Sequence, residues 1–162
     1  MSSHSKSALT HDYLIQNFFY DPSTGEFYRK TPDGLRRLGF VNRDGYLVAN
    51  IKRKIYLIHR IAWFYVTGEM PKNDIDHIDG DRKNNKFDNI RSVTKAVNRQ
   101  NLRSAMPFNK TGLLGVQVHH GKYRATINVA GTQIRLGRFD TKEEAHEAYL
   151  KAKRRIHVGC TI

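Results

Sequence analysis

The chain has 162 residues, enough for one ordinary domain or two small ones, and 28 lysines and arginines against 15 acids give a formal net charge of +13. A hydrophobic content of 39% excludes wholesale disorder, the single cysteine, Cys160, excludes an internal disulfide, and no apolar stretch is long enough to cross a bilayer. The charge favours a polyanionic partner, nucleic acid before an acidic membrane, and because no secretory signal is apparent we expect a cytoplasmic protein.

The first hundred residues predict short strands joined by turns, with three short helices. Residues 1–10 are serine-rich and predict a flexible N-terminus, and Thr10 is a candidate N-cap for a helix over 11–19. Two hairpins follow, one turning at Asp21–Gly25 and one at Asp44-Gly45. Apolar residues at helical spacing predict a helix from 58 that ends at Gly68, and a short strand over 90–93 precedes the third helix.

The last third of the chain changes character. Residues 102–111 are polar, basic and interrupted by proline and glycine, which predicts a linker between a first domain over 11–101 and a second over 112–162. Three strand-like runs then lead into an amphipathic helix that begins with a capping box, Thr141 and Glu144. The expected fold class is α+β, built from small antiparallel sheets.

Charge is distributed unevenly along the sequence. No Asp or Glu occurs between Asn89 and Phe139, whereas five of the 15 acids lie in the window Asp74–Asp88. An acidic window inside a basic chain has two explanations. Its carboxylates can cap the amides of an Asp/Asn/Gly-rich loop, or they can hold a divalent metal that faces a phosphate backbone.

The same window contains an ordered set of motif residues. Asp76 and His77 are adjacent, Asn89 follows His77 by twelve residues, and Asn98 follows it by twenty-one. With the preceding run LIHRIAWFYVTGEMP, this set resembles the HNH endonucleases, specifically the His-Asn-Asn variant of phage and intron-encoded homing enzymes, over roughly residues 38–101. The resemblance implies a ββα-metal (His-Me finger) core of two antiparallel strands and one helix that grip a single metal ion.

The resemblance also assigns roles to these residues. His77 is expected to act as the general base and Asn89 to tie down the loop and orient His77, while Asp76 and Asn98 are expected to bind one divalent cation, Mg²⁺ or Mn²⁺. Asn98, where other family members carry histidine, argues against tight zinc binding. His59 is expected to be structural, and Asn84 and Asn85 are expected only to support the loop.

The C-terminal region resembles an AP2-type DNA-binding domain, through Gly121-Lys122-Tyr123, Leu136-Gly137, Phe139-Asp140-Thr141 and the Ala148-Tyr149 pair. Alternation along the strands places Val116, Val118, Ala125, Ile127 and Ile134, among others, on an inward face. The expected outward, DNA-reading face comprises Gln117, His119, Arg124, Thr126, Asn128, Gln133 and Arg135. The alternative for these polar residues is an ordinary solvated face.

Further basic residues are candidates for backbone contacts: Lys52, Arg53 and Lys54 in the N-terminal strands, where a solubilising role is equally open, and Arg99 and Arg103 near the linker. With these resemblances, the sequence predicts a metal-dependent, site-directed DNA endonuclease of the phage homing type. A phage-encoded protein would be located in the cytoplasm of the host cell. It would bind double-stranded DNA as a monomer or weak dimer and would nick as a monomer. The rival hypothesis is a non-catalytic, sequence-specific DNA-binding regulator with a degenerate HNH fold.

Overall fold

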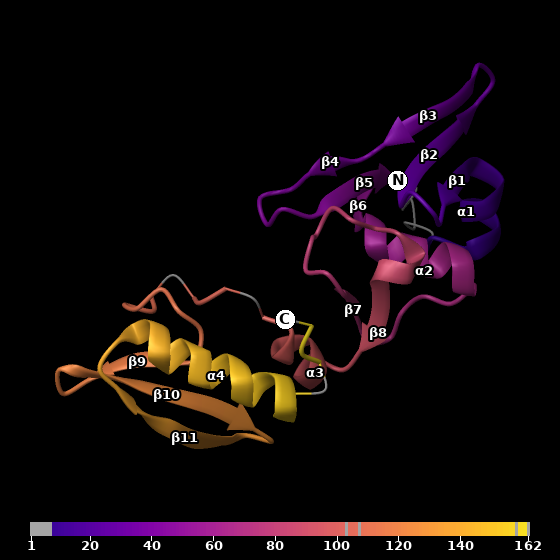
Figure 1. The fold of residues 1–162 in the computed structure, drawn as a ribbon. Coiled ribbons are helices and arrows are strands. Elements are labelled where there is room, and N and C mark those ends of the chain that lie inside the picture. The colour runs from indigo at the N-terminus through magenta and orange to yellow at the C-terminus, as the bar shows by residue number, and fades with distance from the viewer. Residues whose placement is uncertain (1–7, 103, 107, 158, 162) are drawn as a thin grey trace, which may run out of the picture. The chain divides into compact units, whose positions relative to one another are not determined.

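The computed structural model describes residues 8–102, 104–106, 108–157 and 159–161, and the chain divides into two compact units. Unit 1 spans Met1–Val93 and unit 2 spans Thr94–Ile162. The boundary between the compact units thus falls before the segment 102–111 that the sequence predicts as a linker. Each unit is described separately below, and Figure 1 shows the elements of both.

Unit 1 contains small antiparallel sheets and two α-helices. One sheet has the order β1-β2-β3, a second has the order β4-β5-β6, and β7 pairs with β8. The elements are α1 (His11–Asn17), β1 (Phe18–Asp21), β2 (Glu26–Thr31), β3 (Gly34–Leu38), β4 (Phe40–Val41), β5 (Leu47–Ile51), β6 (Lys54–Leu57), α2 (Ile58–Thr67), β7 (Asp74–His77), the 3-10 helix η1 (Phe87–Asn89) and β8 (Ile90–Val93).

One hydrophobic core joins these elements. It collects buried side chains from α1, β1, β2, β5, α2, β7 and β8, with Phe18, Tyr20 and Phe27 among the largest. Helix α2 supplies most of the helical contribution, since Ile58, Ile61 and Phe64 are all buried. Because Ile75 of β7 is buried in the same core, the core that anchors α2 also anchors the strand that carries Asp76 and His77.

Several local predictions hold in unit 1. Thr10 caps α1 by accepting a hydrogen bond from the Tyr13 amide at 3.3 Å, and Gly68 ends α2 in the left-handed conformation. Helix α1 is shorter than predicted, because Phe18 is extended and already pairs with β2. Strand β3 was not predicted, since the run Gly34–Leu38 lacks apolar alternation and forms a strand only by pairing with β2.

Unit 2 contains a short helix and a three-stranded sheet covered by a longer helix. Its elements are α3 (Lys95–Gln100), β9 (Val116–His119), β10 (Lys122–Val129), β11 (Thr132–Phe139) and α4 (Lys142–Ile156). The antiparallel sheet has the order β11-β10-β9, and α4 lies across one face of it (Figure 1). The capping box is present, with Thr141 and Glu144 each accepting a hydrogen bond from the other's amide at 3.2 Å.

Together the two units confirm a mixed helix-and-strand protein with small antiparallel sheets. None of the described helices is long and apolar enough to span a membrane. The linker predicted for 102–111 contains no helix or strand among its described residues.

Alternation along the C-terminal strands is less regular than predicted. Val118 and Ile134, expected to face inward, are 58% and 42% exposed, and Thr126, expected on the outward face, is 7% exposed. For Thr126 and Ile134 the nearby irregularity is a register shift between Ala125 and Thr126 where β10 pairs with β11, whereas Val118 lies on β9, which pairs with β10 in continuous register. Such a bulge breaks the two-residue period, so Thr126 is a poor candidate for contact with DNA.

Candidate active site

The candidate site begins on β7, which carries Asp76 and His77. Strand β7 pairs with β8 so that Asp76 lies opposite Arg91 and His77 lies opposite Ile90. Burial alternates along β7: His77 is buried in the core, whereas Asp76 lies on the half-exposed face. The two neighbouring side chains therefore point in opposite directions, as the geometry of a strand requires.

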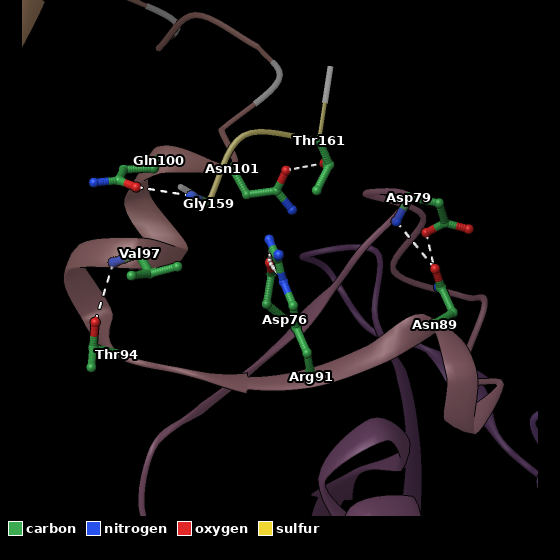
Figure 2. Close-up of polar contacts among 10 residues, drawn as sticks. All are labelled: Asp76, Asp79, Asn89, Arg91, Thr94, Val97, Gln100, Asn101, Gly159 and Thr161. Atoms are coloured by element: carbon green, nitrogen blue, oxygen red, sulfur yellow. Dashed lines mark hydrogen bonds and ion pairs between the residues drawn. The ribbon is translucent and has the colours of Figure 1, made fainter. Parts of the chain in front are cut away.

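Asp76 is held by an arginine from the adjacent strand. Arg91 donates from Nε and Nη2 to Oδ2 of Asp76 at 3.2 and 3.0 Å (Figure 2), and the Asp76 side chain is 10% exposed. Both hydrogen bonds go to one carboxylate oxygen and are charge-assisted. The low exposure of the Asp76 side chain shields the ion pair from water. A cation bound through Asp76 has to share the carboxylate with Arg91 or displace it.

His77 is enclosed by aromatic side chains and one amide. Its Nε2 lies 3.1 Å from Oδ1 of Asn85, the His59 ring meets it edge-on with centroids 4.8 Å apart, and the Tyr46 ring lies 6.1 Å away. Burial, followed by the positive charges of His77 and Arg60, lowers the pKa of His59 from 6.5 to about 3. His59 is thus a neutral neighbour of His77.

The buried Nδ1 of His59 has no hydrogen-bond partner among the described residues. This location agrees with the structural role expected for His59. The proximity of the two rings could not be foreseen from the sequence, since α2 and β7 meet only through tertiary packing.

The loop between β7 and β8 is closed by Asn89. Its side chain accepts from the Asp79 amide at 3.1 Å and donates to Asp79 Oδ1 at 2.9 Å (Figure 2). It also donates to the Asn84 carbonyl at 2.8 Å. Its own carbonyl accepts from the Ile78 amide at 2.8 Å. Asn89 therefore fastens both ends of the loop, and these contacts go to the loop rather than to His77.

Asp79 is a turn residue of this loop. Burial alone would raise its pKa, but hydrogen bonds from Asn89, Asn84 and the Asp81 amide outweigh burial and lower the pKa below its usual value. Asp79 therefore stays ionised as an acceptor for three loop donors. This arrangement matches the first explanation of the acidic window, in which carboxylates cap the amides of a loop.

The sequence did not indicate that Asn85 contacts His77. Asn85 was expected only to support the loop, yet it is 1% exposed and its side-chain oxygen faces His77. No local signal marks it, because the adjacent Asn84 has the same side chain and only the path of the loop decides which of the two reaches the histidine.

Asn98 lies on α3, whose N-cap is Thr94 (Figure 2). Within unit 2 this helix is fastened to the C-terminal segment: the Gly159 amide donates to Gln100 Oε1 at 3.0 Å, and Thr161 hydrogen bonds with Asn101. Asp76 and Asn98 belong to different compact units, so their joint binding of a metal stays a prediction.

The available donors suit a hard cation with few protein ligands. No three His, Cys, Asp or Glu side chains group as a metal site among the described residues. One carboxylate and one amide oxygen fit Mg²⁺ or Mn²⁺, which keep water or substrate oxygens as their remaining ligands, better than they fit zinc.

The predicted DNA-binding residues occupy both units. Lys52 and Arg53 form the two-residue turn between β5 and β6, with φ of 51° and 61°, and Lys54 follows on β6. Arg99 lies in the last turn of α3, and Arg103 falls outside the described residues. On the C-terminal sheet the side chains that are exposed or half-exposed include Gln117, His119, Arg124, Asn128, Gln133 and Arg135.

Comparisons with known proteins bear on the site. Residues 56–100 match the family model described as HNH endonuclease, a segment that runs from β6 to the end of α3. No curated protein and no solved structure matches the chain. The matched segment contains Asp76, His77, Asn89 and Asn98, and covers less than half of the chain. The segment that carries the candidate site is therefore similar to HNH endonucleases.

Proposed function

We propose that the protein is a metal-dependent DNA endonuclease that hydrolyses a phosphodiester at a site built on β7. One observation carries the proposal: the segment that matches the HNH endonuclease model contains a buried, oriented histidine, His77, next along β7 to a carboxylate, Asp76, whose side chain is 10% exposed. The net charge of +13 is consistent with a nucleic-acid substrate.

In the proposed reaction His77 accepts a proton from water, and the oxygen of that water attacks the scissile phosphorus. The bond from phosphorus to the 3′-oxygen breaks, and that oxygen takes up a proton from solvent, which leaves a 5′-phosphate and a 3′-hydroxyl. Asp76 and Asn98 would hold one divalent cation, which when bound stabilises the charge that develops on the phosphate. Asn89 keeps the loop closed so that the backbone around His77 stays in place.

The resemblances support a narrower form of the proposal. The His-Asn-Asn motif set suggests a site-directed homing endonuclease of phage type, and the AP2-like sheet in unit 2 would select the DNA sequence. One nuclease site per chain predicts nicking by the monomer. A helix-covered sheet whose other face carries Arg, Gln and Asn suits reading of base edges in the major groove.

One observation favours the rival, a DNA-binding regulator without catalysis. The guanidinium of Arg91 occupies Oδ2 of Asp76, the carboxylate that a catalytic cation needs. If a cation cannot displace the Arg91 guanidinium from Asp76, the nuclease fold would serve only as a scaffold for DNA binding. The two functions differ in whether DNA is cut at all.

A nicking assay separates them. Supercoiled plasmids that carry a randomised insert are incubated with the protein in Mg²⁺ or Mn²⁺, and nicked circles are isolated and sequenced to locate the cut. We expect site-selective nicks from the wild type and none from His77→Ala. Absence of nicking by the wild type in either metal, with DNA binding retained, would leave the regulator as the function.

The control for this assay is a matched pair of aspartate substitutions. Asp76→Asn removes the proposed cation ligand, whereas Asp33→Asn changes an exposed aspartate in the turn before β3. We expect nicking to be lost in the first and kept in the second, with DNA binding retained in both.

A further inference from the structure

The amide of Asn85 lies in the core between His77 and the N-terminal hairpin of unit 1. The residue is 1% exposed, and its Oδ1 lies 3.1 Å from Nε2 of His77. Its Nδ2 donates to the carbonyl of Lys83 at 3.1 Å. Asn85 thus links the loop between β7 and β8 to the imidazole ring of the proposed general base.

The bond to Lys83 fixes which end of the amide faces the histidine. A carbonyl oxygen only accepts hydrogen bonds, so the Asn85 NH₂ group must point to Lys83 and the oxygen must point to His77. An amide oxygen is itself an acceptor, so Nε2 of His77 has to carry the proton. In the neutral imidazole the lone pair is then on Nδ1, the nitrogen that would have to accept the proton in the proposed reaction.

The N-terminal hairpin in turn holds Asn85 in place. Tyr20 on β1 donates from its hydroxyl to the Asn85 carbonyl at 2.6 Å, and burial raises the pKa of Tyr20, so the hydroxyl stays protonated as a donor. The Phe87 amide donates to the Pro22 carbonyl at 3.0 Å. A Cβ atom on Gly25 would lie 2.5 Å from the Lys86 nitrogen and 2.6 Å from the Asn85 carbonyl carbon.

We propose that Asn85 is a positioning residue for the nuclease reaction: it fixes the tautomer and orientation of His77, and the β1–β2 hairpin supports it. This inference rests on the proposed function. It assigns to Asn85 an orienting contact that the family resemblance would give to Asn89, whose side chain is engaged with the loop instead. It also gives the N-terminal sheet a role in catalysis besides any contact with DNA.

Two substitutions at Asn85 separate positioning from loop support. Asn85→Leu removes both the acceptor for His77 and the donor to Lys83, whereas Asn85→Asp keeps an acceptor for His77 and loses the donor. We expect kcat for plasmid nicking to fall by roughly 10- to 100-fold in Asn85→Leu, the range seen when a hydrogen-bond partner of a functional imidazole is removed. In Asn85→Asp we expect kcat to stay within a few-fold of the wild type, with KM for DNA unchanged in both.

The matched controls are Asn50→Leu and Asn50→Asp, at an exposed position on β5. We expect both controls to nick like the wild type. Wild-type kcat in Asn85→Leu, or equal losses of kcat in Asn85→Leu and Asn85→Asp, would overturn the inference. In either case nicking by the wild type and its loss in His77→Ala would leave the proposed nuclease function standing.

A second measurement tests the tautomer without any cleavage. In protein labelled with ¹⁵N-histidine, two- and three-bond ¹⁵N–¹H correlations at neutral pH report which ring nitrogen carries the proton. We expect His77 to carry it on Nε2 in the wild type and in Asn85→Asp, and to lose this preference in Asn85→Leu. A wild-type His77 protonated on Nδ1, or a ring unaffected by Asn85→Leu, would overturn the inference even if the protein cuts no DNA.

The support from the hairpin is tested by Tyr20→Phe, which removes one hydroxyl and touches neither ring nitrogen of His77. We expect a smaller fall in kcat than in Asn85→Leu and the same direction of change in the His77 spectrum. A kcat and a His77 spectrum identical to those of the wild type would overturn the proposed role of the hairpin.

Discussion

At the residue scale, the candidate site contains a buried neutral histidine, His59, that packs against the proposed general base, His77. His59 is 3% exposed, and its pKa is about 3 in the folded protein against 6.5 for the ordinary side chain. The unfolded chain therefore binds one more proton than the folded chain between these two pH values. Stability contributed by neutral His59 is complete above pH 6.5 and declines as the pH falls towards 3.

We predict that the free energy of unfolding of the wild type falls between about pH 6.5 and pH 4, with a slope from His59 of up to about 1.4 kcal/mol per pH unit. Urea titrations across this range measure it. His59→Gln should flatten the pH profile, because glutamine takes up no proton on unfolding. His120→Gln, at an exposed turn, is the control and should leave the slope unchanged. Parallel pH profiles for wild type and His59→Gln would contradict the assignment.

Arg91 is the second residue of the site that can be tested, because it pairs with the proposed metal ligand Asp76. Its guanidinium neutralises the largely buried carboxylate of Asp76, its cross-strand partner on β7. Removing a positive charge beside a carboxylate strengthens the attraction of that carboxylate for a cation.

We predict that Arg91→Gln lowers the Mg²⁺ concentration needed for half-maximal nicking, while it destabilises the fold by about 1–3 kcal/mol through loss of a charge-assisted pair. A Mg²⁺ titration of nicking and a urea titration measure the two effects. Arg37→Gln is the matched control, since Arg37 pairs with Glu26 at a more exposed position. An unchanged Mg²⁺ requirement in Arg91→Gln would show that the guanidinium does not compete with the cation.

At the scale of elements, helix α4 has a complete N-terminal cap. The Thr141 hydroxyl accepts from the Glu144 amide, and the Glu144 carboxylate accepts from the Thr141 amide. Acidic residues occupy the first turn and basic residues the last, as the helix dipole favours. The sequence predicted this start because capping depends on residues only three positions apart.

We predict that Thr141→Ala destabilises unit 2 by about 1 kcal/mol, since the Glu144 amide at the helix start loses the hydroxyl that accepts its hydrogen bond. Thermal unfolding followed by circular dichroism measures the loss. Lys142→Ala is the control, because its long contact with Glu143 is exposed and contributes little. Equal melting of Thr141→Ala and wild type would mean that α4 starts independently of the cap.

At the scale of the whole molecule, basic residues are spread along the chain, whereas five of the 15 acidic residues lie in the window 74–88. The window 74–88 contains Asp76, paired with Arg91, and Asp79, which caps the loop. The stretch from Asn89 to Phe139 holds no acid and includes all three strands of the C-terminal sheet. Binding to DNA should therefore depend strongly on salt.

We predict that Lys54→Ala reduces the slope of log K against log [salt] by about 0.9, the value for one lost phosphate contact, with sequence preference unchanged. Gln133→Ala should instead relax the sequence preference and leave the slope unchanged, because an amide reads base edges and releases no counterion. Fluorescence anisotropy over a salt series, with the selected site and a scrambled duplex, measures both quantities. A slope unaffected by Lys54→Ala would favour the solubilising role.

The sequence by itself determined the features that depend on residues close together in the chain. Turns at Asp21–Gly25, the caps at Thr10 and Thr141, the strand at 90–93 and the order of the motif residues all follow from residue type and short spacing. Only the tertiary structure decided which of two adjacent asparagines reaches His77, that Arg91 pairs with Asp76, and that His59 packs against His77. These contacts join residues beyond the reach of turn and capping patterns, and their geometry is set by the shared core and the strand register, which no local pattern encodes.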